Sequence, residues 1–199
     1  MVAKQTLQIA KSVTEVDSVP IKTDAQPNRS RQWMLDALIA LMREKPFSQI
    51  TISEIAARSQ LDRRTFYRHF KTKEDVIVHR IRQLSKHFEP FLHRQEPLRT
   101  EEIALHFFRI CEANKDLLLL LYANKLMPLL LYELNTIFPE HHNYYHGSAG
   151  IYGPYDEDYA LAYHVGGFWN TLLRWIGDGM EKTPEELAKT VASFLPEQI

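Results

Sequence analysis

The chain has 199 residues, of which 45% are hydrophobic and 25% are charged, as is typical of one moderately sized globular domain or of a small domain joined to a larger one. Its single cysteine, Cys111, excludes an intrachain disulfide and fits a reducing cytosol. The N-terminus lacks the unbroken apolar core of a signal peptide, and the most apolar run, residues 117–132, is interrupted by Asn124, Lys125 and Pro128. We therefore expect a cytoplasmic protein without a membrane span.

The formal net charge of −1 conceals two oppositely charged parts of the chain. Residues 29–86 hold 13 Lys or Arg against 6 Asp or Glu, a balance of +7, whereas the rest of the chain holds 11 against 19, a balance of −8. This asymmetry predicts a basic module that binds a polyanion and an acidic remainder that carries it.

The chain begins with a polar segment and then becomes helical. Residues 1–28 lack a steady hydrophobic period and include two prolines, so we expect a mobile N-terminal extension. Apolar residues then recur at three- and four-residue spacing from Met34 to Met42, which predicts a first helix that ends near Glu44.

Two short helices are predicted next. Thr51 and Glu54 have the spacing of a capping box, in which each side chain satisfies an exposed amide at a helix start. Residues 59–61 make a tight turn, and Asp62 is a good N-cap for the second short helix, which extends to Phe70.

The rest of the chain is also predicted to be helical. Thr72 is expected to cap a helix that stops near Pro90. The later predicted elements are a helix over 101–113, an apolar segment over 115–138 kinked at Pro128, a loop from Pro139, a helix over 156–178, and a last helix that starts with the capping box of Thr183 and Glu186. No alternating strand pattern occurs, so the sequence predicts an all-α fold.

The second short helix is unusually basic and aromatic, with the sequence LDRRTFYRHF at residues 61–70. At about 100° per residue, four basic side chains and one tyrosine share one arc of roughly 140°: Arg63, Arg64, Tyr67, Arg68 and Lys71. Phe66 and Phe70 lie together beside that arc. Composition alone is also compatible with an amphipathic helix whose arginines are simply solvated.

The neighbouring helix favours a role in DNA binding. A short helix, a three-residue turn and a second short helix with a basic outer face form a helix-turn-helix. The second helix fits the major groove, which is about 12 Å wide. Arginines near its N-terminus can pair with guanine, a tyrosine and nearby lysines can contact phosphates, and the two phenylalanines would seat the helix on a core.

The stretch TISEIAARSQLDRRTFYRHFKTKEDV, residues 51–76, resembles the DNA-binding signature of the TetR/AcrR transcriptional regulators without a gap. The resemblance covers about residues 30–80. It implies an N-terminal three-helix helix-turn-helix DNA-binding domain, here residues 29–75. A helical linker and a larger C-terminal domain for dimerisation and effector binding would then occupy residues 76–199.

The resemblance also implies roles for individual residues. The implied phosphate contacts come from Thr51 and Lys73, the base contacts from Arg63, Arg64 and Thr65, the backbone contacts from Tyr67 and His69, and more variable contacts from Ser53 and Arg68. One departure is Gln60, because the family's turn commonly has glycine there. If that position needs a left-handed backbone, Gln60 adds strain of about 1 kcal/mol.

The stretch GGFWNTLLRWIGDGMEKTPEELAKTV, residues 166–191, is similar to a C-terminal domain of TetR-like regulators from Gram-positive bacteria, a branch that includes a dihydroxyacetone-kinase regulator. This resemblance implies a homodimer in which two helices from each chain form a four-helix interface. Gly166 and Gly167 allow close helix approach, and Trp169 and Phe194 offer large apolar faces. The alternative is that these residues only close a core within one chain.

Other candidate sites are less specific. Aromatic and cationic residues around the kinked segment could line an effector cavity, although such stripes are usually packing, and they are Phe107, Phe108, Tyr122, Tyr163, Trp169 and Arg174. His141, His142 and His146 share a predicted loop without rigid ligand spacing, so we expect no metal site and no cofactor. Cys111 is expected to be a core residue.

The sequence therefore predicts a homodimeric, DNA-binding transcriptional regulator, and a repressor that an effector releases from its operator. One alternative is a regulator or DNA-organising factor controlled by a partner protein. A second is a helical enzyme that acquired a basic domain. The enzyme alternative has little support, because the sequence contains no P-loop, nucleophile elbow, dinucleotide fingerprint or paired metal ligands.

Overall fold

The computed structural model describes residues 27–88, 99–145 and 157–194, and within these ranges it contains helices and no strand, which confirms the all-α prediction. In the N-terminal half the elements are α2 (Pro27–Glu44), the 3-10 turn η2 (Phe47–Gln49), α3 (Ile52–Arg58), α4 (Arg63–His69) and α5 (Lys73–Ser85). In the C-terminal half they are α7 (Thr100–Ala113), α8 (Lys115–Ala123), α9 (Met127–Tyr145), α10 (Glu157–Gly177) and α11 (Pro184–Ser193). Residues 1–26 of the predicted N-terminal extension lie outside these ranges. Residues 27 and 28, which were predicted to belong to it, are the first two residues of α2.

Four of the described helices begin at side chains that the sequence indicated. Thr51, Thr72 and Thr183 each accept a hydrogen bond from the third amide of the following helix and complete a capping box. Asp62 accepts from the amide of Thr65 at the start of α4. Because these bonds satisfy amides that have no partner inside the helix, the local sequence determines where these four helices begin.

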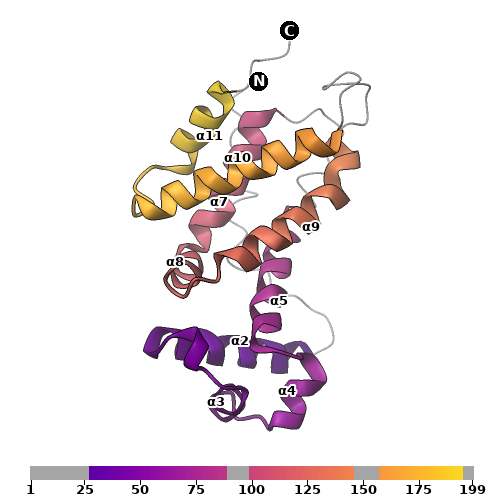
Figure 1. Cartoon of the computed structure of the whole chain (residues 1–199), viewed down its shortest axis with the longest axis vertical. Helices are drawn as coiled ribbons and strands as arrows, with labels where there is room; N and C mark the ends of the chain where they lie inside the picture. The colour runs from indigo at the N-terminus through magenta and orange to yellow at the C-terminus, as the bar shows by residue number, and fades with distance from the viewer. Residues whose placement is uncertain (1–26, 89–98, 146–156, 195–199) are drawn as a thin grey trace, which may run out of the picture.

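The N-terminal half forms a three-helix unit with α5 emerging from it (Figure 1). Helix α2 lies between α8 on one side and α3 and α4 on the other, and α5 rises toward the C-terminal half. The side chains of Leu38, Ile55, Phe66 and Val76 come from four different helices and are fully buried. Their burial holds α3 and α4 in fixed positions against α2.

The apolar segment over residues 115–138 contains a break, and the prediction of a kink at Pro128 is wrong. Helices α8 and α9, the latter measured to Thr136, are bent by 119° relative to each other. The chain turns at Lys125, whose φ of 59° is left-handed, whereas Pro128 is the second residue of α9. A proline in the first turn of a helix loses no internal hydrogen bond, so it begins α9 without bending it.

Two further boundaries differ from the prediction. Helix α9 continues to Tyr145, so residues 139–145 are helical where a loop was expected. Helix α5 ends at Ser85, earlier than the predicted stop near Pro90, a residue that lies outside the described ranges.

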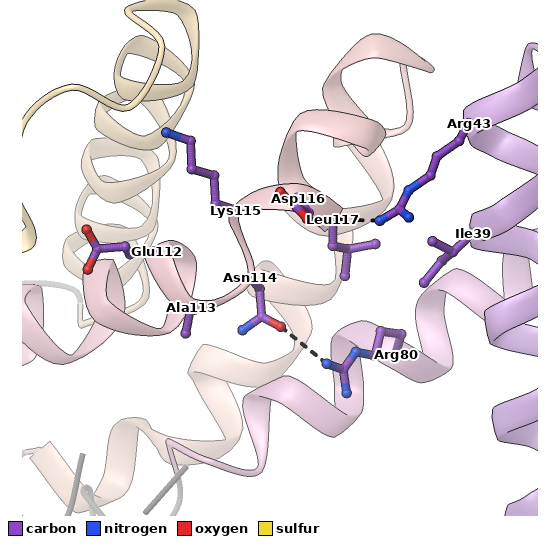
Figure 2. Close-up of a pocket in the computed structure, with 9 residues that line it drawn as sticks. All are labelled: Ile39, Arg43, Arg80, Glu112, Ala113, Asn114, Lys115, Asp116 and Leu117. Carbon is purple, nitrogen blue, oxygen red and sulfur yellow. Dashed lines mark hydrogen bonds and ion pairs between the residues drawn. The ribbon is translucent and has the colours of Figure 1, made fainter. Parts of the chain in front are cut away.

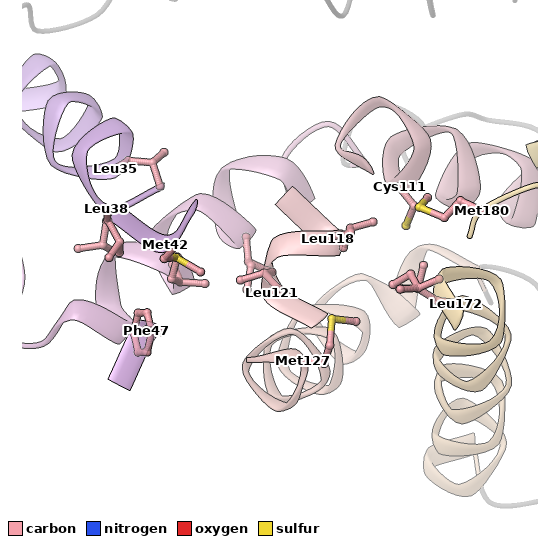
Figure 3. Packing of buried hydrophobic residues seen from close by; sticks show 14 of the residues in the cluster. Leu35, Leu38, Met42, Phe47, Cys111, Leu118, Leu121, Met127, Leu172 and Met180 are labelled. Carbon is pink, nitrogen blue, oxygen red and sulfur yellow. The ribbon is translucent and has the colours of Figure 1, made fainter. Parts of the chain in front are cut away.

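One hydrophobic cluster runs through both halves of the molecule (Figure 3). It passes from Leu38 and Met42 in α2 through Leu121 in α8 and Met127 in α9 to Leu172 in α10. The two halves therefore share a continuous core, which limits their independent movement.

The C-terminal part of this core is rich in aromatic side chains. The ring of Phe108 lies 5.7 Å from that of Trp175, and the ring of Phe107 lies 5.3 Å from that of Phe168, both edge to face. Cys111 is buried in the same region, and this burial raises the pKa of its thiol far above the ordinary value. The thiol is therefore uncharged, as expected of a core cysteine.

Helix α5 joins the two halves through an ion pair. Its residue Arg82 donates two hydrogen bonds to Glu133 of α9, from Nε to Oε2 at 2.6 Å and from Nη2 to Oε1 at 3.0 Å. The Glu133 side chain is only 1% exposed, so the bidentate pair supplies the partners that a buried carboxylate requires.

Within the described ranges, no single helix is long and apolar enough to cross a bilayer. Helix α8 and the part of α9 up to Thr136 would together be long and apolar enough, but they are bent by 119° relative to each other.

Removing the guanidinium of Arg82 should destabilise the fold. We expect Arg82→Met to lower the free energy of unfolding by about 2 kcal/mol, because the buried Glu133 carboxylate loses two charge-assisted hydrogen bonds. Urea unfolding at one protein concentration measures the change. Arg174→Met is the matched control, because Arg174 forms an exposed pair with Asp178, and it should cost less than about 0.5 kcal/mol. Equal stability of the two variants would contradict the structural role of the pair.

Candidate nucleic-acid interface

Two phenylalanines seat α4 on the core, as the sequence predicted. Phe66 is 0% exposed and Phe70 is 6% exposed, and their ring centroids are 5.9 Å apart. Phe70 also packs edge to face against His79 of α5 at 5.6 Å. The aromatic edge of α4 therefore faces inward and fixes the direction in which its other side points.

The opposite side of α4 carries cations that are free to bind an anion. Arg63, Arg64, Tyr67 and Arg68 are all exposed, and the guanidinium of Arg63 lies 5.9 Å from the centre of the Tyr67 ring. Among the described residues, no carboxylate oxygen comes within 4.0 Å of these three arginines. Three unpaired guanidiniums on two turns of helix repel one another, and a polyanion relieves that repulsion.

Helix α3 is held in place at both of its ends. At its start, Glu54 completes the capping box with Thr51 and also accepts a hydrogen bond from Lys45 at 2.5 Å. The Lys45 ammonium and the amide and hydroxyl of Thr51 lower the pKa of Glu54 to about 2, so this carboxylate is ionised at neutral pH. At its end, Arg58 donates two bonds of 2.8 Å to Glu44 at the end of α2.

Thr51 and Ser53 are exposed at the start of α3, which is also where the sequence predicts contacts. The Thr51 hydroxyl accepts from the Glu54 amide and donates to the Glu54 carboxylate. A hydroxyl oxygen used in this way can still accept a second bond but has no further proton to donate to a phosphate.

The turn between α3 and α4 contains a residue with a left-handed backbone, at the position where the sequence analysis considered one. Gln60 has a φ of 57°, and the amides of Gln60 and Leu61 donate to the carbonyls of Ala57 and Ala56. These bonds close the end of α3, as a glycine usually does at this position. Gln60 adopts the conformation at a cost of about 1 kcal/mol, which its hydrogen-bonded surroundings overcome.

Lys73 and His69 lie in surroundings that the sequence did not indicate. The ammonium of Lys73 donates to the carbonyls of Phe47 at 2.6 Å and Ile50 at 2.8 Å, and it lies 4.4 Å from the Phe47 ring centre. Two of its three protons are therefore used to hold η2 against α5. Lys73 is thus a brace within the protein, and its predicted phosphate contact stays a prediction that depends on the one remaining proton.

His69 is half-buried. Its Nε2 atom is buried and has no hydrogen-bond partner among the described residues. Burial lowers the pKa of His69, and the charges of Arg31 and Arg68 lower it further, so the neutral imidazole is favoured. Thr65 is half-buried, and its amide is bound to Asp62. Contacts from Thr65 and His69 to DNA stay predictions.

The six residues predicted to line an effector cavity have different surroundings. Phe107 and Phe108 are packed in the aromatic part of the core, and Trp169 is half-buried. Tyr122 is 48% exposed, Tyr163 is 74% exposed, and Arg174 lies on the surface. Their part in effector binding stays a prediction.

Across the described ranges, no group of three or more His, Cys, Asp or Glu side chains is arranged to hold a metal ion. His141 and His142 fall on α9, but their side chains and the whole of His146 lie outside what the structure describes.

Two contacts between the halves were not anticipated from the sequence. The amide of Phe47 donates to Asn124 Oδ1 at 2.8 Å, and Arg80 Nη2 donates to Asn114 Oδ1 at 3.2 Å. Each asparagine follows the last residue of a helix, which is a local signal that the sequence contains. Its partner lies 34 or 77 residues away, however, and only the packing of the two halves reveals it.

Two family models match the chain. The model described as "Bacterial regulatory proteins, tetR family" matches residues 34–79, and one described as "Transcriptional regulator C-terminal region" matches residues 99–197. The first covers α3, α4 and most of α2 and α5, and the second extends from α7 past α11.

Similar proteins include a transcriptional regulator known from its sequence and proteins with solved structures. A Bacillus subtilis protein described as the uncharacterized HTH-type transcriptional regulator YxbF is 27% identical over an alignment of 184 residues, and the match covers 86% of this chain and 46% of that protein. The chain thus spans about half the length of this relative. The structure of Lin0861 from Listeria innocua matches 88% of this chain and 94% of its own, with a TM-score of 0.72 and 16% identity.

A further solved structure is that of the Bacillus subtilis transcriptional regulator FadR in complex with stearoyl-CoA. It matches 82% of this chain and 96% of its own, with a TM-score of 0.55 and 18% identity. At these identities the two structural matches establish the fold. The resemblance to the dihydroxyacetone-kinase-regulator branch stays a prediction.

Replacing Lys73 should destabilise the N-terminal half. We expect Lys73→Met to lower the free energy of unfolding by about 1–2 kcal/mol, because the carbonyls of Phe47 and Ile50 lose a charged donor. Urea unfolding measures the loss, and hydrogen exchange over residues 47–50 locates it. Lys71→Met is the matched control, because its side chain is exposed and should contribute little. If Lys73→Met kept full stability and only weakened DNA binding, the brace would be wrong and the phosphate contact correct.

Proposed function

Because this chain belongs to the TetR family of bacterial regulatory proteins, we propose that it binds a double-stranded DNA operator as a homodimer and represses transcription in the cytoplasm. The observation that carries the proposal is the outward side of α4, where Arg63, Arg64 and Arg68 are exposed and unpaired among the described residues. A protein that binds in a DNA groove needs exposed cations on a helix that is held rigidly by the core.

In this proposal, α4 enters the major groove and the start of α3 lies on the adjacent backbone. Arg63 and Arg64, at the N-terminus of α4, pair with base edges, most favourably with guanine O6 and N7. Tyr67, Arg68 and Ser53 donate to phosphates. Thr51 is assigned a secondary contact, because its hydroxyl proton is already donated to Glu54. Thr65, His69 and Lys73 are assigned secondary contacts, because their polar groups are partly occupied or covered.

The proposed dimer forms through α10 and α11. Side chains along one side of α10 are strongly exposed, with Tyr159 at 77% and Tyr163 at 74%, and Phe194 after α11 is 72% exposed. A Cβ atom added to Gly166 or Gly167 would meet nothing within 4 Å, so packing within the chain does not require glycine there. Glycines next to exposed aromatic rings suit the close approach of a helix from a second copy.

We assign the release of DNA to an effector that binds in the C-terminal half. The fold neighbour FadR was solved with stearoyl-CoA, which gives a precedent for a small-molecule effector on this fold. Helices α3 and α4 together form the reading head of each chain. A change in α9 would reach this reading head through Arg82 and Glu133, because α5 carries Arg82 and α9 carries Glu133. Since the two reading heads must fit grooves about 34–36 Å apart or a multiple, a small rotation of α5 would weaken binding.

Substitutions on the outward side of α4 should remove operator binding without affecting the fold. We expect Arg63→Ala to weaken binding to a selected operator by about 30-fold or more, because each of the two protomers loses a bidentate base contact of about 1–3 kcal/mol. Tyr67→Ala should weaken binding to all sequences, because it removes a phosphate contact. The operator is first selected from random DNA with the wild-type protein, and affinity is then measured by gel-shift titration.

Lys86→Ala is the control for these variants, because Lys86 is exposed at the end of α5, away from α4. Its operator affinity should match that of the wild-type protein. Wild-type affinity for Arg63→Ala would contradict the assignment of α4 as the reading helix.

A charge placed on the exposed side of α10 should separate the proposed dimer. We expect Tyr163→Glu to convert the protein to a monomer at micromolar concentration, because a carboxylate would be buried against the partner chain without a counter-charge. Tyr122→Glu is matched in chemistry but lies on α8, and it should leave the dimer intact. Sedimentation velocity distinguishes the two outcomes, and a dimeric Tyr163→Glu variant would exclude this part of α10 from the interface.

A further inference from the structure

A cleft of about 420 Å³ lies where the DNA-binding half meets the C-terminal half (Figure 2). Its walls come from Ile39 and Arg43 of α2, from Arg80 of α5, and from the corner between α7 and α8 at residues 112–117. The volume lies within the range of about 300–1,000 Å³ that is usual for small-molecule sites. None of the C-terminal residues predicted to bind an effector lines it.

Arg80 is the cation at the inner side of this cleft, and most of its hydrogen-bonding capacity is unused. Its guanidinium is half-buried, and its Nη2 donates one bond, to Asn114 Oδ1 at 3.2 Å. Across the described ranges, no carboxylate oxygen lies within 4.0 Å of it. Burial lowers the pKa of Arg80, and the charge of Asp36 only partly offsets this effect. A desolvated guanidinium with free donors is stabilised by an anion.

Arg43 supplies a second cation at the outer side of the cleft. Its Nη2 lies 4.0 Å from Asp116 Oδ2, and the Asp116 side chain is 89% exposed, so this pair is weak. Figure 2 shows Arg43 and Arg80 on the same side of the α7–α8 corner, both facing it, while Glu112 and Lys115 extend away from them. Lys115 instead donates to the carbonyl of Gly179.

The start of α8 adds a positive contribution on the opposite wall. Asn114 occupies the N-cap position of α8 but makes no side-chain capping bond to it, because its Oδ1 accepts from Arg80 and its Nδ2 donates to the carbonyl of Ile110. The first amides of α8 therefore lack a side-chain cap. Uncapped amides at a helix start attract negative charge, and the Asp116 carboxylate in the first turn of α8 offsets part of this effect.

We propose that this cleft binds a small organic anion through a phosphate or carboxylate group held by Arg80 and Arg43. The guanidinium of Arg80 offers the paired donors that either oxyanion accepts, and the start of α8 lies across from it. The site is separate from the effector site assigned to the C-terminal half.

The position of the cleft allows a bound anion to change DNA binding, an inference that rests on the proposed function. Its walls belong to α2 and α5, which carry the reading head, and to α7 and α8, which belong to the C-terminal half. An anion that contacts both sets of helices favours one orientation of the reading head over others, and thereby changes operator affinity.

Binding is tested on the full chain without DNA, so the result does not depend on the proposed function. The probes are inorganic phosphate and succinate, titrated at constant ionic strength with sodium chloride as the balancing salt. Isothermal calorimetry gives the affinity, and the Nε–Hε signals of the arginines in a ¹⁵N spectrum give the location. We expect saturable binding of at least one probe, with one site per chain and a shifted Arg80 signal. Comparison of the two probes shows whether the site prefers phosphate or carboxylate.

The variants separate the cleft from other cationic surface. Arg80→Gln should weaken binding at least tenfold, and Arg43→Gln should weaken it severalfold. Arg58→Gln, which removes an exposed arginine outside the cleft and outside every assigned binding site, should bind as the wild-type protein does. If Arg80→Gln does not fold, Arg80→Lys retains the charge without the paired donors and should still weaken binding severalfold. The proposal is overturned if neither probe saturates, or if the Arg80 and Arg43 variants bind like Arg58→Gln.

A second measurement tests the consequence for DNA. Operator affinity is compared with and without the preferred anion at matched ionic strength, in the wild-type protein and in Arg80→Gln. A change of threefold or more in the wild-type protein alone supports the link. Saturable anion binding with unchanged operator affinity would keep the site and overturn its regulatory consequence.

Discussion

The carboxylate of Glu133 is buried, and a buried carboxylate must be paired, so helix α5 is held against α9 by Arg82. At its other end, α5 is part of the N-terminal core through Val76 and Ile77. A single helix therefore belongs to both halves of the molecule. The direction in which α4 points is fixed relative to the C-terminal half by this shared helix, and every proposal about the release of DNA depends on it.

Much of the fold could be predicted because helix starts and apolar periods are local. Thr51, Thr72 and Thr183 each act on an amide three residues away, so their capping role can be read directly from the sequence. The separation of α4 into an aromatic and a cationic side follows from the same local geometry, which places Phe66 and Phe70 one turn apart. The residues that seat the reading helix and those that face outward were therefore predictable together.

The remaining features depend on contacts between distant parts of the chain. The sequence around Lys73 is compatible with a phosphate contact and with a hydrogen bond to the carbonyl of Phe47. Only the packing of η2 against α5 distinguishes these two roles. Pro128 was ambiguous for another reason, since a proline is compatible with a kink within a helix and with the first turn of a new one. The left-handed Lys125 decides between them, and a lysine gives no signal of that conformation in the sequence.

Cys111 gives the molecule an internal reporter of its own opening. It is the only cysteine of the chain, and it is buried near Leu172 and Met180 (Figure 3). A thiol reagent can reach it only when the packing around α7 opens, so the rate of labelling measures how often the C-terminal half exposes its interior. Any ligand that tightens this half slows the reaction, and the native protein needs no added label to show it.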